Sequence, residues 1–146
     1  TNTNERKVFF ADDSAVARAQ VAKILDNMGI EHMCAKNGAQ ALAQLKQIAD
    51  EAEERGESVH DVLQAIVTDV EMPEMDGYVL TRNIKEDKRF NGIPVMMHSS
   101  LSSEGNKRLG SKVGADAYVA KLQPAEFAEM LNSLIEKADA ERLEPA

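Results

Sequence analysis

Residues 65–77 read AIVTDVEMPEMDG, and this stretch decides the fold. A short apolar run ends at Asp69 and is followed by a loop that contains Pro73 and Gly77. Short apolar runs rich in branched residues are typical of buried strands, and proline and glycine are typical of the turns that follow them. The stretch therefore predicts a buried strand that carries a carboxylate at its end.

The same pattern recurs along the chain, because short apolar runs alternate with longer segments of helical periodicity. We expect strands at residues 8–11, 30–35, 65–69, 94–98 and 117–120, and helices at about 15–28, 38–56, 78–88, 103–113 and 124–137. This alternation is typical of strand–helix units on a parallel sheet. The sequence therefore predicts an α/β fold with a five-stranded parallel sheet flanked by five helices.

Composition and charge exclude several classes of protein. The chain has 146 residues, enough for one domain, and its formal net charge of −8 disfavours binding to nucleic acid or to anionic membrane surfaces. A single cysteine, Cys34, cannot form an internal disulfide, and no apolar run approaches the roughly 20 residues that span a bilayer. We therefore expect a cytoplasmic protein that binds no nucleic acid and does not insert into a membrane.

The chain is expected to divide into one domain and two ends. We expect a flexible N-terminal segment at 1–6, the domain at 7–137 and a polar C-terminal tail at 138–146. The chain does not begin with Met, which suggests that it is cut from a longer protein. Within the domain, residues 48–64 are acidic and poor in apolar side chains, so we expect a solvated extension of the second helix followed by a loop. An acidic surface that binds a partner is the alternative.

Polar residues stand at the carboxyl ends of four of the predicted strands. Asp12 and Asp13 follow the first strand, Asp69 ends the third, Ser99 follows the fourth and Lys121 follows the fifth. Parallel strands end at the same edge of a sheet, which is where open α/β proteins bind ligands. We therefore expect these five side chains to face one crevice.

Three carboxylates in one crevice repel one another unless a cation joins them. Mg²⁺ prefers oxygen ligands and keeps several waters, so it fits two or three carboxylates and a main-chain carbonyl. An aspartate can also act as a nucleophile toward a phosphoryl group, whose oxygens Lys121 and Ser99 would stabilise. Each feature alone has a simpler explanation, as a helix N-cap, a turn residue or a solvated charge. These separate explanations do not account for the placement of all five residues at the same edge of the predicted sheet.

The sequence resembles the response-regulator receiver domains of bacterial two-component signalling over nearly its whole length. The resemblance depends on Asp12, Asp13, the stretch 67–77, Ser99 and Lys121. Ser99 and Lys121 follow Asp69 by 30 and 52 residues, as in that family. The resemblance implies a flavodoxin-like, doubly wound sheet with the strand order 2-1-3-4-5. It also implies a regulatory protein and not an enzyme, with at most self-catalysed phosphorylation and dephosphorylation.

This resemblance assigns a role to each residue of the predicted site. Asp69 would accept the phosphoryl group from a sensor histidine kinase. Mg²⁺ would be bound by Asp12, Asp13, Asp69 and the main-chain carbonyl of Glu71. Lys121 would contact the phosphoryl group, and Ser99 and Tyr118 would form the switch that alters the face made by the fourth helix, the fifth strand and the fifth helix.

Two stretches, 97–102 and 113–121, are most similar to the receivers of CheV-type chemotaxis coupling proteins. In those proteins a scaffold domain that binds chemoreceptors and a kinase precedes a C-terminal receiver. The resemblance therefore implies a kinase of the chemotaxis type as the phosphoryl donor, and a chemoreceptor scaffold domain upstream of Thr1.

The residue after Lys121 departs from the family, as does the extra length in residues 48–64. Receivers usually carry a Lys-Pro pair, joined by a cis peptide bond, where this chain has Lys121-Leu122. A cis bond without proline costs about 2.5–4 kcal/mol, so we expect a trans bond or a visibly strained one. The direction in which Lys121 points is therefore open.

Two other functions compete with this interpretation. The first is an interaction module with the receiver fold that works without phosphate, which the missing Lys-Pro pair favours. The second is an aspartate-dependent phosphatase, because Asp69-Val70-Glu71 loosely matches the Asp-x-Asp motif of those enzymes. The acidic pair after the first strand and the lack of a substrate-binding insertion argue against a phosphatase.

Two further groups of residues have ambiguous roles. The histidines share no metal-ligand spacing, so we expect no metal site among His32, His60 and His98. His98 precedes Ser99, and we expect it to fill the strand end instead of tuning the switch. The Glu71 side chain either helps to set the lifetime of a phosphorylated Asp69 or is an exposed loop carboxylate without such a role.

Overall fold

A computed structural model gives the structure of residues 6–101, 103–121 and 123–143. Within these ranges five strands alternate with five α-helices, and two short 3-10 helices, η1 and η2, lie between them. The elements are β1 (Lys7–Ala11), α1 (Ala15–Asn27), β2 (Glu31–Ala35), α2 (Gly38–Glu54), η1 (Val59–Asp61), β3 (Ala65–Thr68), α3 (Gly77–Glu86), η2 (Lys88–Phe90), β4 (Val95–Ser99), α4 (Glu104–Lys112), β5 (Ala117–Ala120) and α5 (Pro124–Leu143). The alternation that the sequence predicts is confirmed, and most element ends lie close to the expected ones.

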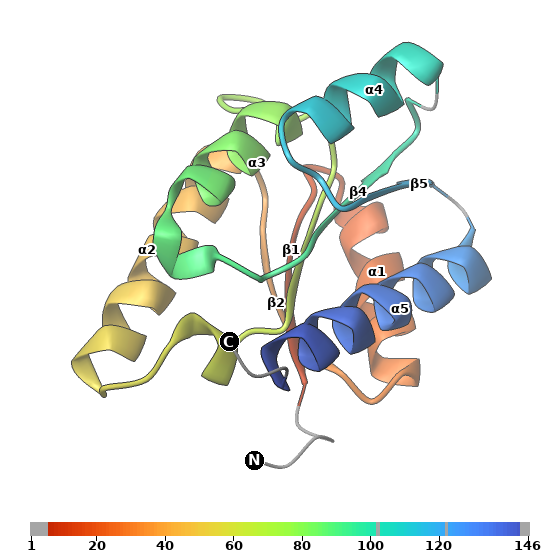
Figure 1. Ribbon diagram of the computed structural model, residues 1–146. Coiled ribbons are helices and arrows are strands. Elements are labelled where there is room, and N and C mark those ends of the chain that lie inside the picture. The colour runs from red at the N-terminus through yellow and green to blue at the C-terminus, as the bar shows by residue number, and fades with distance from the viewer. Residues whose placement is uncertain (1–5, 102, 122, 144–146) are drawn as a thin grey trace.

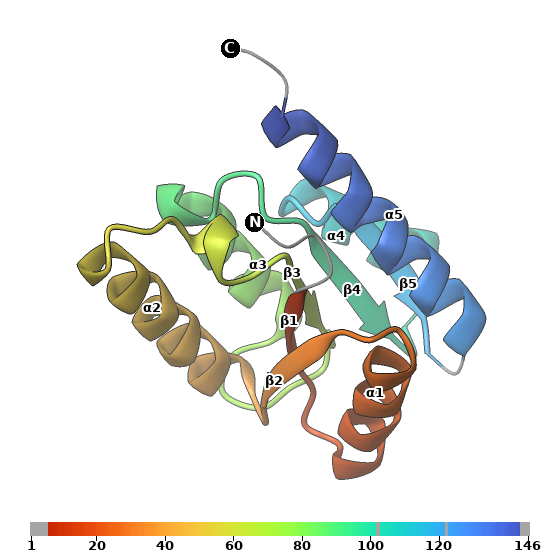
Figure 2. The same cartoon turned by 90° about the horizontal axis from the view of Figure 1, so that it is seen from below.

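The strands form one parallel sheet in the order β2-β1-β3-β4-β5. Phe10 of β1, for example, lies opposite Cys34 of β2 on one side and Val67 of β3 on the other. Figures 1 and 2 show α1 and α5 against one face of this sheet and α2 and α3 against the other. The predicted doubly wound α/β fold is confirmed, and the carboxyl ends of all the strands lie at one edge.

Both faces of the sheet are covered, which explains why the central strands are apolar at nearly every position. Successive side chains of a strand point to opposite faces. Phe9 and Ile66 are therefore buried in the layer with α2 and α3, whereas Phe10 and Val67 pack in the opposite layer with Phe127 of α5. Full burial of one such side chain contributes about 1.5–3 kcal/mol, so these two layers fix the strand ends that carry the polar residues.

Residues 48–64 are packed more firmly than the sequence predicts. The second helix continues into this segment as expected, but Ala49 and Ala52 are fully buried. After the helix, Val59 of η1 and Leu63 enter the same core layer. Because alanine is only weakly apolar and the residues around Ala49 and Ala52 are acidic, the sequence does not indicate that one side of this helix is buried. The prediction of a solvated extension is wrong for that side.

The acidic side of this extension is bound by an arginine from another part of the chain. Arg89 of η2 donates hydrogen bonds to Asp87 (2.8 Å), Asp50 (2.6 Å) and Glu53 (3.1 Å). Hydrogen bonding to Asp87, and then to Asp50, raises the pKa of the Arg89 guanidinium above its ordinary value. The network joins α2 to the turn before β4, and it occupies two of the carboxylates that a partner-binding acidic surface would use.

The residue that precedes β1 contacts the last helix. Arg6, which the sequence places in a flexible segment at 1–6, donates a hydrogen bond to Asn132 of α5 (3.1 Å). Its guanidinium also lies 3.7 Å from the carboxylate of Asp139. These contacts span more than a hundred residues of sequence, so no local pattern reveals them. Residues 1–5 lie outside the described residues.

The last helix is longer than the sequence predicts. α5 continues to Leu143, whereas the sequence predicts its end near Lys137 and a polar tail at 138–146. The added residues include alanine, glutamate and arginine, which are good helix formers, so polarity alone does not end the helix. Neither α5 nor another helix in the described ranges is long and apolar enough to cross a membrane. Residues 144–146 lie outside the described residues.

A buried hydroxyl without a partner makes a first prediction about stability. Thr81 of α3 is fully buried, and within the described ranges its Oγ1 is the one buried side-chain polar atom that has no hydrogen-bond partner. Thr81→Val removes the cost of desolvating this hydroxyl, so it should raise the free energy of unfolding by about 1 kcal/mol in denaturant titrations. Thr68 is equally buried but donates to the main-chain oxygen of Asp69 (2.8 Å), so Thr68→Val should have the opposite effect. A loss of stability in Thr81→Val would contradict the prediction.

The Arg89 network makes a second prediction. Arg89→Ala should lower the free energy of unfolding by about 1 kcal/mol, because it removes one cation from three carboxylates. The loss should shrink at high salt, since Asp50 and Glu53 are exposed. Arg89→Lys keeps the charge without the planar fork, and it should recover only part of the loss. Equal stability of Arg89→Ala and the unchanged protein at low salt would show that the network contributes nothing.

Candidate functional site

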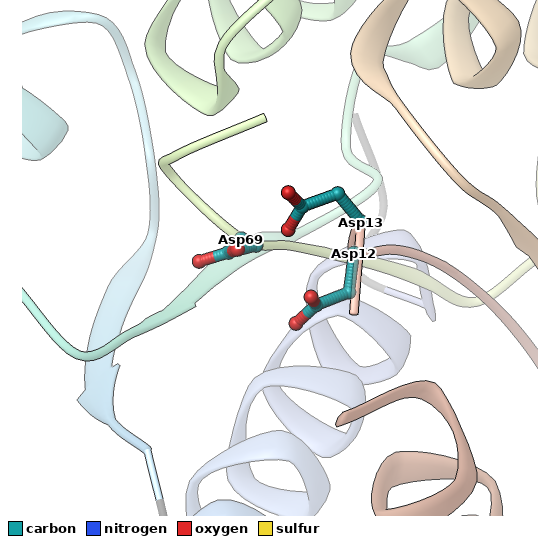
Figure 3. A group of neighbouring side chains, drawn as sticks. All are labelled: Asp12, Asp13 and Asp69. Carbon is teal, nitrogen blue, oxygen red and sulfur yellow. The ribbon is translucent and has the colours of Figure 1, made fainter. Parts of the chain in front are cut away.

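Three aspartates meet where β1 and β3 end. Asp12 and Asp13 follow β1, Asp69 follows the neighbouring β3, and one carboxylate oxygen from each lies within 4.8 Å of the others. Figure 3 shows the three carboxyl groups gathered on the same side of these strand ends. Asp12 and Asp69 are buried, with 2% and 5% of their surface exposed, whereas Asp13 is exposed. The structure thus brings together the cluster that the strand ends predict.

The start of α1 fixes the first of these aspartates. Ser14 is the N-cap, and its hydroxyl accepts a hydrogen bond from the Ala17 N–H (3.2 Å). Asp12 Oδ1 accepts from the Ser14 N–H (3.0 Å), and the Arg18 guanidinium donates to the main-chain oxygen of Asp12 (2.8 Å). Ser14 supplies the cap of the helix, so the Asp13 carboxylate is not used as the cap and can face the cluster. The sequence does not predict the Arg18 contact, since a contact from a helix side chain back to the main chain leaves no residue pattern.

Lys121 points into the cluster, although the residue after it is not proline. Its Nζ lies 3.0 Å from Asp12 Oδ2 and 3.3 Å from Asp69 Oδ2. Burial by itself lowers the pKa of Lys121, but the two carboxylates outweigh this effect and raise that pKa above its ordinary value. The direction of Lys121, which the sequence leaves open, is therefore toward the aspartates. The Lys121–Leu122 bond involves Leu122, which lies outside the described residues.

Asp69 is the carboxylate whose environment is most unusual. Burial raises the pKa of Asp69 to about 6, and the negative charge of Asp12 adds to the rise. Lys121 lowers this pKa, as does the Val70 N–H, which donates to Asp69 Oδ1 at 2.8 Å. Near neutral pH, Asp69 is thus ionised but weakly stabilised, which suits a nucleophile or a metal ligand.

These residues fit a hard divalent cation. The three carboxylates carry three negative charges when they are ionised, and Lys121 supplies one positive charge against them. Oxygen-only ligands, an excess of negative charge and the solvent-exposed side at Asp13 match the preference of Mg²⁺ for carboxylates and water. The cluster is therefore compatible with Mg²⁺. Within the described residues it is the one group of three or more carboxylate, histidine or cysteine side chains close enough to share an ion.

Ser99 and Tyr118 both contact the segment that leads from β4 to α4. Ser99 is fully buried at the end of β4, and its hydroxyl accepts a hydrogen bond from the Leu101 N–H (3.1 Å). The Tyr118 hydroxyl donates to the main-chain oxygen of Leu101. Burial raises the pKa of Tyr118 to about 12, so this tyrosine stays a donor at neutral pH. Leu101 therefore connects the two residues that the sequence predicts as a switch.

The end of the loop after Asp69 lies close to the Asp69 main chain because of Gly77. The Gly77 N–H donates to the main-chain oxygen of Val70 (2.8 Å). A Cβ atom at Gly77 would lie 2.0 Å from the main-chain oxygen of Asp69, so a larger residue cannot take this position without moving the main chain of Asp69. The glycine that ends the stretch 65–77 is thus needed for this close approach to the main chain.

An open pocket of about 540 Å³ lies beside the cluster. Its lining consists of Asp13, Val70, Glu71, Met72, Pro73, Asp76 and Tyr78. The volume is within the range of pockets that admit small molecules. The Glu71 side chain is exposed on this lining, and the role of the Glu71 main-chain carbonyl as a metal ligand stays a prediction.

His98 fills the end of β4, as expected. Its ring packs edge-on against Phe127 of α5, with 4.9 Å between the ring centroids. Burial lowers the pKa of His98 to about 4, so its ring is neutral at pH 7. The side chain is therefore a packing residue between the sheet and α5.

Comparison with known proteins identifies the family. The chain matches the family model for the response regulator receiver domain over residues 8–134. Chemotaxis protein CheV3 of Helicobacter pylori is 32% identical over 133 residues, which cover 91% of this chain and 42% of that protein. The chain thus spans less than half the length of this relative.

Solved structures give the same fold. The chemotaxis response regulator CheY4 of Vibrio cholerae has a TM-score of 0.75 at 25% identity, with coverage of 89% of this chain and 98% of that one. The receiver domain of a sensor histidine kinase from Pseudomonas aeruginosa, solved with a magnesium ion coordinated in its active-site cleft, has a TM-score of 0.75 at 20% identity. The alignment covers 90% of this chain and 98% of that chain. At this identity the similarity concerns the fold alone.

The raised pKa of Asp69 makes a pH-dependent prediction. The pKa of Asp69 is about 6 in the folded protein and 3.8 ordinarily. Above pH 6 the ionised carboxylate therefore destabilises the fold, and this destabilisation disappears as the pH falls toward 3.8. Without Mg²⁺, Asp69→Asn should therefore raise the free energy of unfolding at neutral pH by about 1–3 kcal/mol. The gain should disappear in acid, which denaturant titrations across this pH range can measure.

The matched control for this experiment is Asp13→Asn, at the exposed member of the same cluster. It should change the stability little, because its carboxylate is already solvated. A gain in Asp69→Asn that does not depend on pH would contradict the assignment of the raised pKa to Asp69.

Proposed function

The chain belongs to the response-regulator receiver family, and we propose that it accepts a phosphoryl group on Asp69, with Mg²⁺, from a phosphohistidine of a sensor histidine kinase. The observation that carries this proposal is the aspartate cluster with Lys121 between Asp12 and Asp69. A buried, weakly stabilised carboxylate beside an ammonium group is suited to nucleophilic attack on an anionic phosphoryl group.

In the proposed reaction, an oxygen of Asp69 attacks the phosphorus atom, and the bond between phosphorus and the histidine nitrogen breaks. The electron pair of that bond leaves with the imidazole, and Asp69 becomes an acyl phosphate. Mg²⁺ supplies positive charge for the phosphoryl oxygens, and Asp12, Asp13, Asp69 and the Glu71 carbonyl would hold it. Lys121, 3.3 Å from Asp69 Oδ2, provides a second positive charge that the fold positions in advance.

We propose that Ser99 and Tyr118 transmit the phosphorylated state. Their shared contact with Leu101 supports this, because a phosphoryl group that attracts the Ser99 hydroxyl would alter the Leu101 segment and the Tyr118 hydrogen bond. Phosphorylation then favours one of two arrangements through the contacts it makes in each. The face formed by α4, β5 and α5 would change its affinity for a partner.

We further propose that the domain acts in bacterial chemotaxis as part of a CheV-type coupling protein in the cytoplasm. The similarity to the chemotaxis protein CheV3 supports this, and the single Cys34 suits a reducing compartment. A kinase of the chemotaxis type would be the donor, and an upstream scaffold domain would bind chemoreceptors. The sequence upstream of Thr1 tests this directly, because a DNA-binding domain there would contradict it.

The proposed role is regulatory and not enzymatic. The alternative of a module that works without phosphate was favoured by the missing Lys-Pro pair, but Lys121 contacts both buried carboxylates without it. A phosphatase would turn over free phosphomonoesters, so the absence of such turnover is expected.

The experiment that tests the proposal is intact-protein mass spectrometry after incubation with a small-molecule phosphoryl donor, with and without Mg²⁺. We expect one phosphoryl adduct that hydroxylamine removes, since acyl phosphates are labile to it. Asp69→Asn should give no adduct, and Lys121→Met should slow its formation by about tenfold or more, because it removes a preorganised charge. Asp26→Asn, at an exposed aspartate of α1 outside the cluster, is the control and should behave like the unchanged protein.

The outcomes distinguish the candidate functions. An adduct that requires both Mg²⁺ and Asp69 supports the phosphoryl-accepting function. No adduct in protein that binds Mg²⁺ would contradict it in favour of the phosphate-independent module. An adduct that persists in Asp69→Asn would contradict the choice of acceptor.

A further inference from the structure

α4 is held to the rest of the protein by few contacts. Within this helix Gly110 alone is buried and Asn106 alone is half-buried, and the remaining residues are exposed. A Cβ atom at Gly110 would lie 3.1 Å from both the Met97 sulfur and the Tyr118 ring, so a larger side chain there would have to displace them. Apart from the C-cap residue Val113, which is buried with Val70 and Met97, the position of α4 therefore depends on polar contacts, in contrast to the helices that bury several apolar side chains in the core.

One of these contacts comes from Tyr78, at the start of α3. The Tyr78 hydroxyl donates to the main-chain oxygen of Asn106 (3.2 Å), and the Asn106 side-chain amide donates to the Tyr78 hydroxyl (3.3 Å). The Asn106 N–H in turn donates to the hydroxyl of Ser103, the N-cap of α4 (3.2 Å). Tyr78 therefore contacts the capped first turn of α4, which is not the segment that Tyr118 contacts.

The main chain of Tyr78 is fixed close to the loop after Asp69, which comprises residues 70–77. Tyr78 follows Gly77, whose main chain bonds to Val70 and leaves no room for a Cβ beside Asp69. The Tyr78 ring packs with Val70 in the small apolar cluster that also contains Tyr118, and it lines the pocket beside the aspartates. The Tyr78 ring is thus adjacent both to the main chain after Asp69 and to the pocket, so a change in either would alter its surroundings.

We infer that Tyr78 is a positioning residue that couples the loop after Asp69 to the first turn of α4, through a contact additional to those of Ser99 and Tyr118. The inference rests on the proposed function, because it concerns how phosphorylation of Asp69 alters α4. The two Tyr78–Asn106 hydrogen bonds stabilise the arrangement of α4 without a phosphoryl group. Their loss therefore favours the other arrangement, and with it the binding of a phosphoryl group.

The composition of the chain offers a selective probe for this coupling. The protein has two tyrosines and no tryptophan, and both tyrosines contact the α4 region. Incorporation of 3-fluorotyrosine should give two ¹⁹F resonances, which Tyr78→Phe and Tyr118→Phe assign. Titration with Mg²⁺ and beryllofluoride, an analogue of the phosphoryl group, should move both resonances with the same midpoint. Asp69→Asn should abolish both shifts.

The variant Tyr78→Phe removes only the hydroxyl. With the Tyr118 resonance as the readout, we expect it to lower the beryllofluoride midpoint by about fivefold, as expected for the loss of about one net hydrogen bond. Asn106→Ala removes the side-chain amide but keeps the main-chain oxygen that Tyr78 contacts, so it should lower the midpoint by less. The double variant should lower the midpoint no further than Tyr78→Phe, because that variant already removes both hydrogen bonds. Thr81→Val, which removes a hydroxyl without a partner from the same helix, should leave the midpoint unchanged.

The results separate this inference from the proposed function. If the protein takes no phosphoryl group on Asp69 in the mass measurement, the proposed function fails and the coupling fails with it. If Asp69 is phosphorylated and the Tyr118 resonance moves while the Tyr78 resonance does not, the coupling alone is overturned. A midpoint that is unchanged or higher in Tyr78→Phe also overturns it, because Tyr78 would then be a structural contact only.

Discussion

Two buried carboxylates share one ammonium group, and the rest of the site depends on this arrangement. Asp12 and Asp69 lie within 3.0 Å and 3.3 Å of the Lys121 Nζ, and both are nearly inaccessible to solvent. Burial of unpaired charges is costly, so the pair is stable only because Lys121 compensates part of it. The charge that remains is compatible with a divalent cation, which the proposed phosphoryl transfer to Asp69 would use. The proposed reactivity of Asp69 thus comes with a loss of stability at the same position.

The sheet order makes this arrangement possible. β1 lies between β2 and β3, so the residues after β1 and β3 are neighbours although 56 residues separate Asp13 from Asp69. β5 is at the edge of the sheet, and a long side chain from its end is required to reach Asp12 and Asp69. Lysine has that reach, whereas a short cationic side chain would not. The main-chain contacts of Arg18 and Gly77 then fix the loops that follow β1 and β3, so the carboxylates are placed by a rigid frame.

The sequence predicts most of the fold and the aspartate cluster, because both follow from local information. Strand ends can be read from short apolar runs, and parallel strands must end at one edge. One miss concerns contacts between distant residues, and another concerns the end of a polar helix. The acidic stretch 48–64 looks solvated until Arg89 is seen to bind Asp50 and Glu53, and α5 looks shorter because polarity does not distinguish a helix from a tail. The direction of Lys121 and the Tyr78–Asn106 contact leave no local pattern either, since both depend on how separate elements pack.

The uneven packing of the helices bears on how a signal leaves the site. α5 buries Phe127, Leu131 and Ile135 in the core, so any shift of this helix would expose a large apolar surface. Helix α4 buries only a glycine, and apart from the buried C-cap residue Val113 its position depends on hydrogen bonds that are individually worth about 1 kcal/mol. If Asp69 is phosphorylated as we propose, the phosphoryl group could supply interactions of that size through Ser99 and the neighbouring loops, but it could not compensate for the loss of a core layer. We therefore expect α4, and not α5, to respond to the proposed phosphorylation of Asp69.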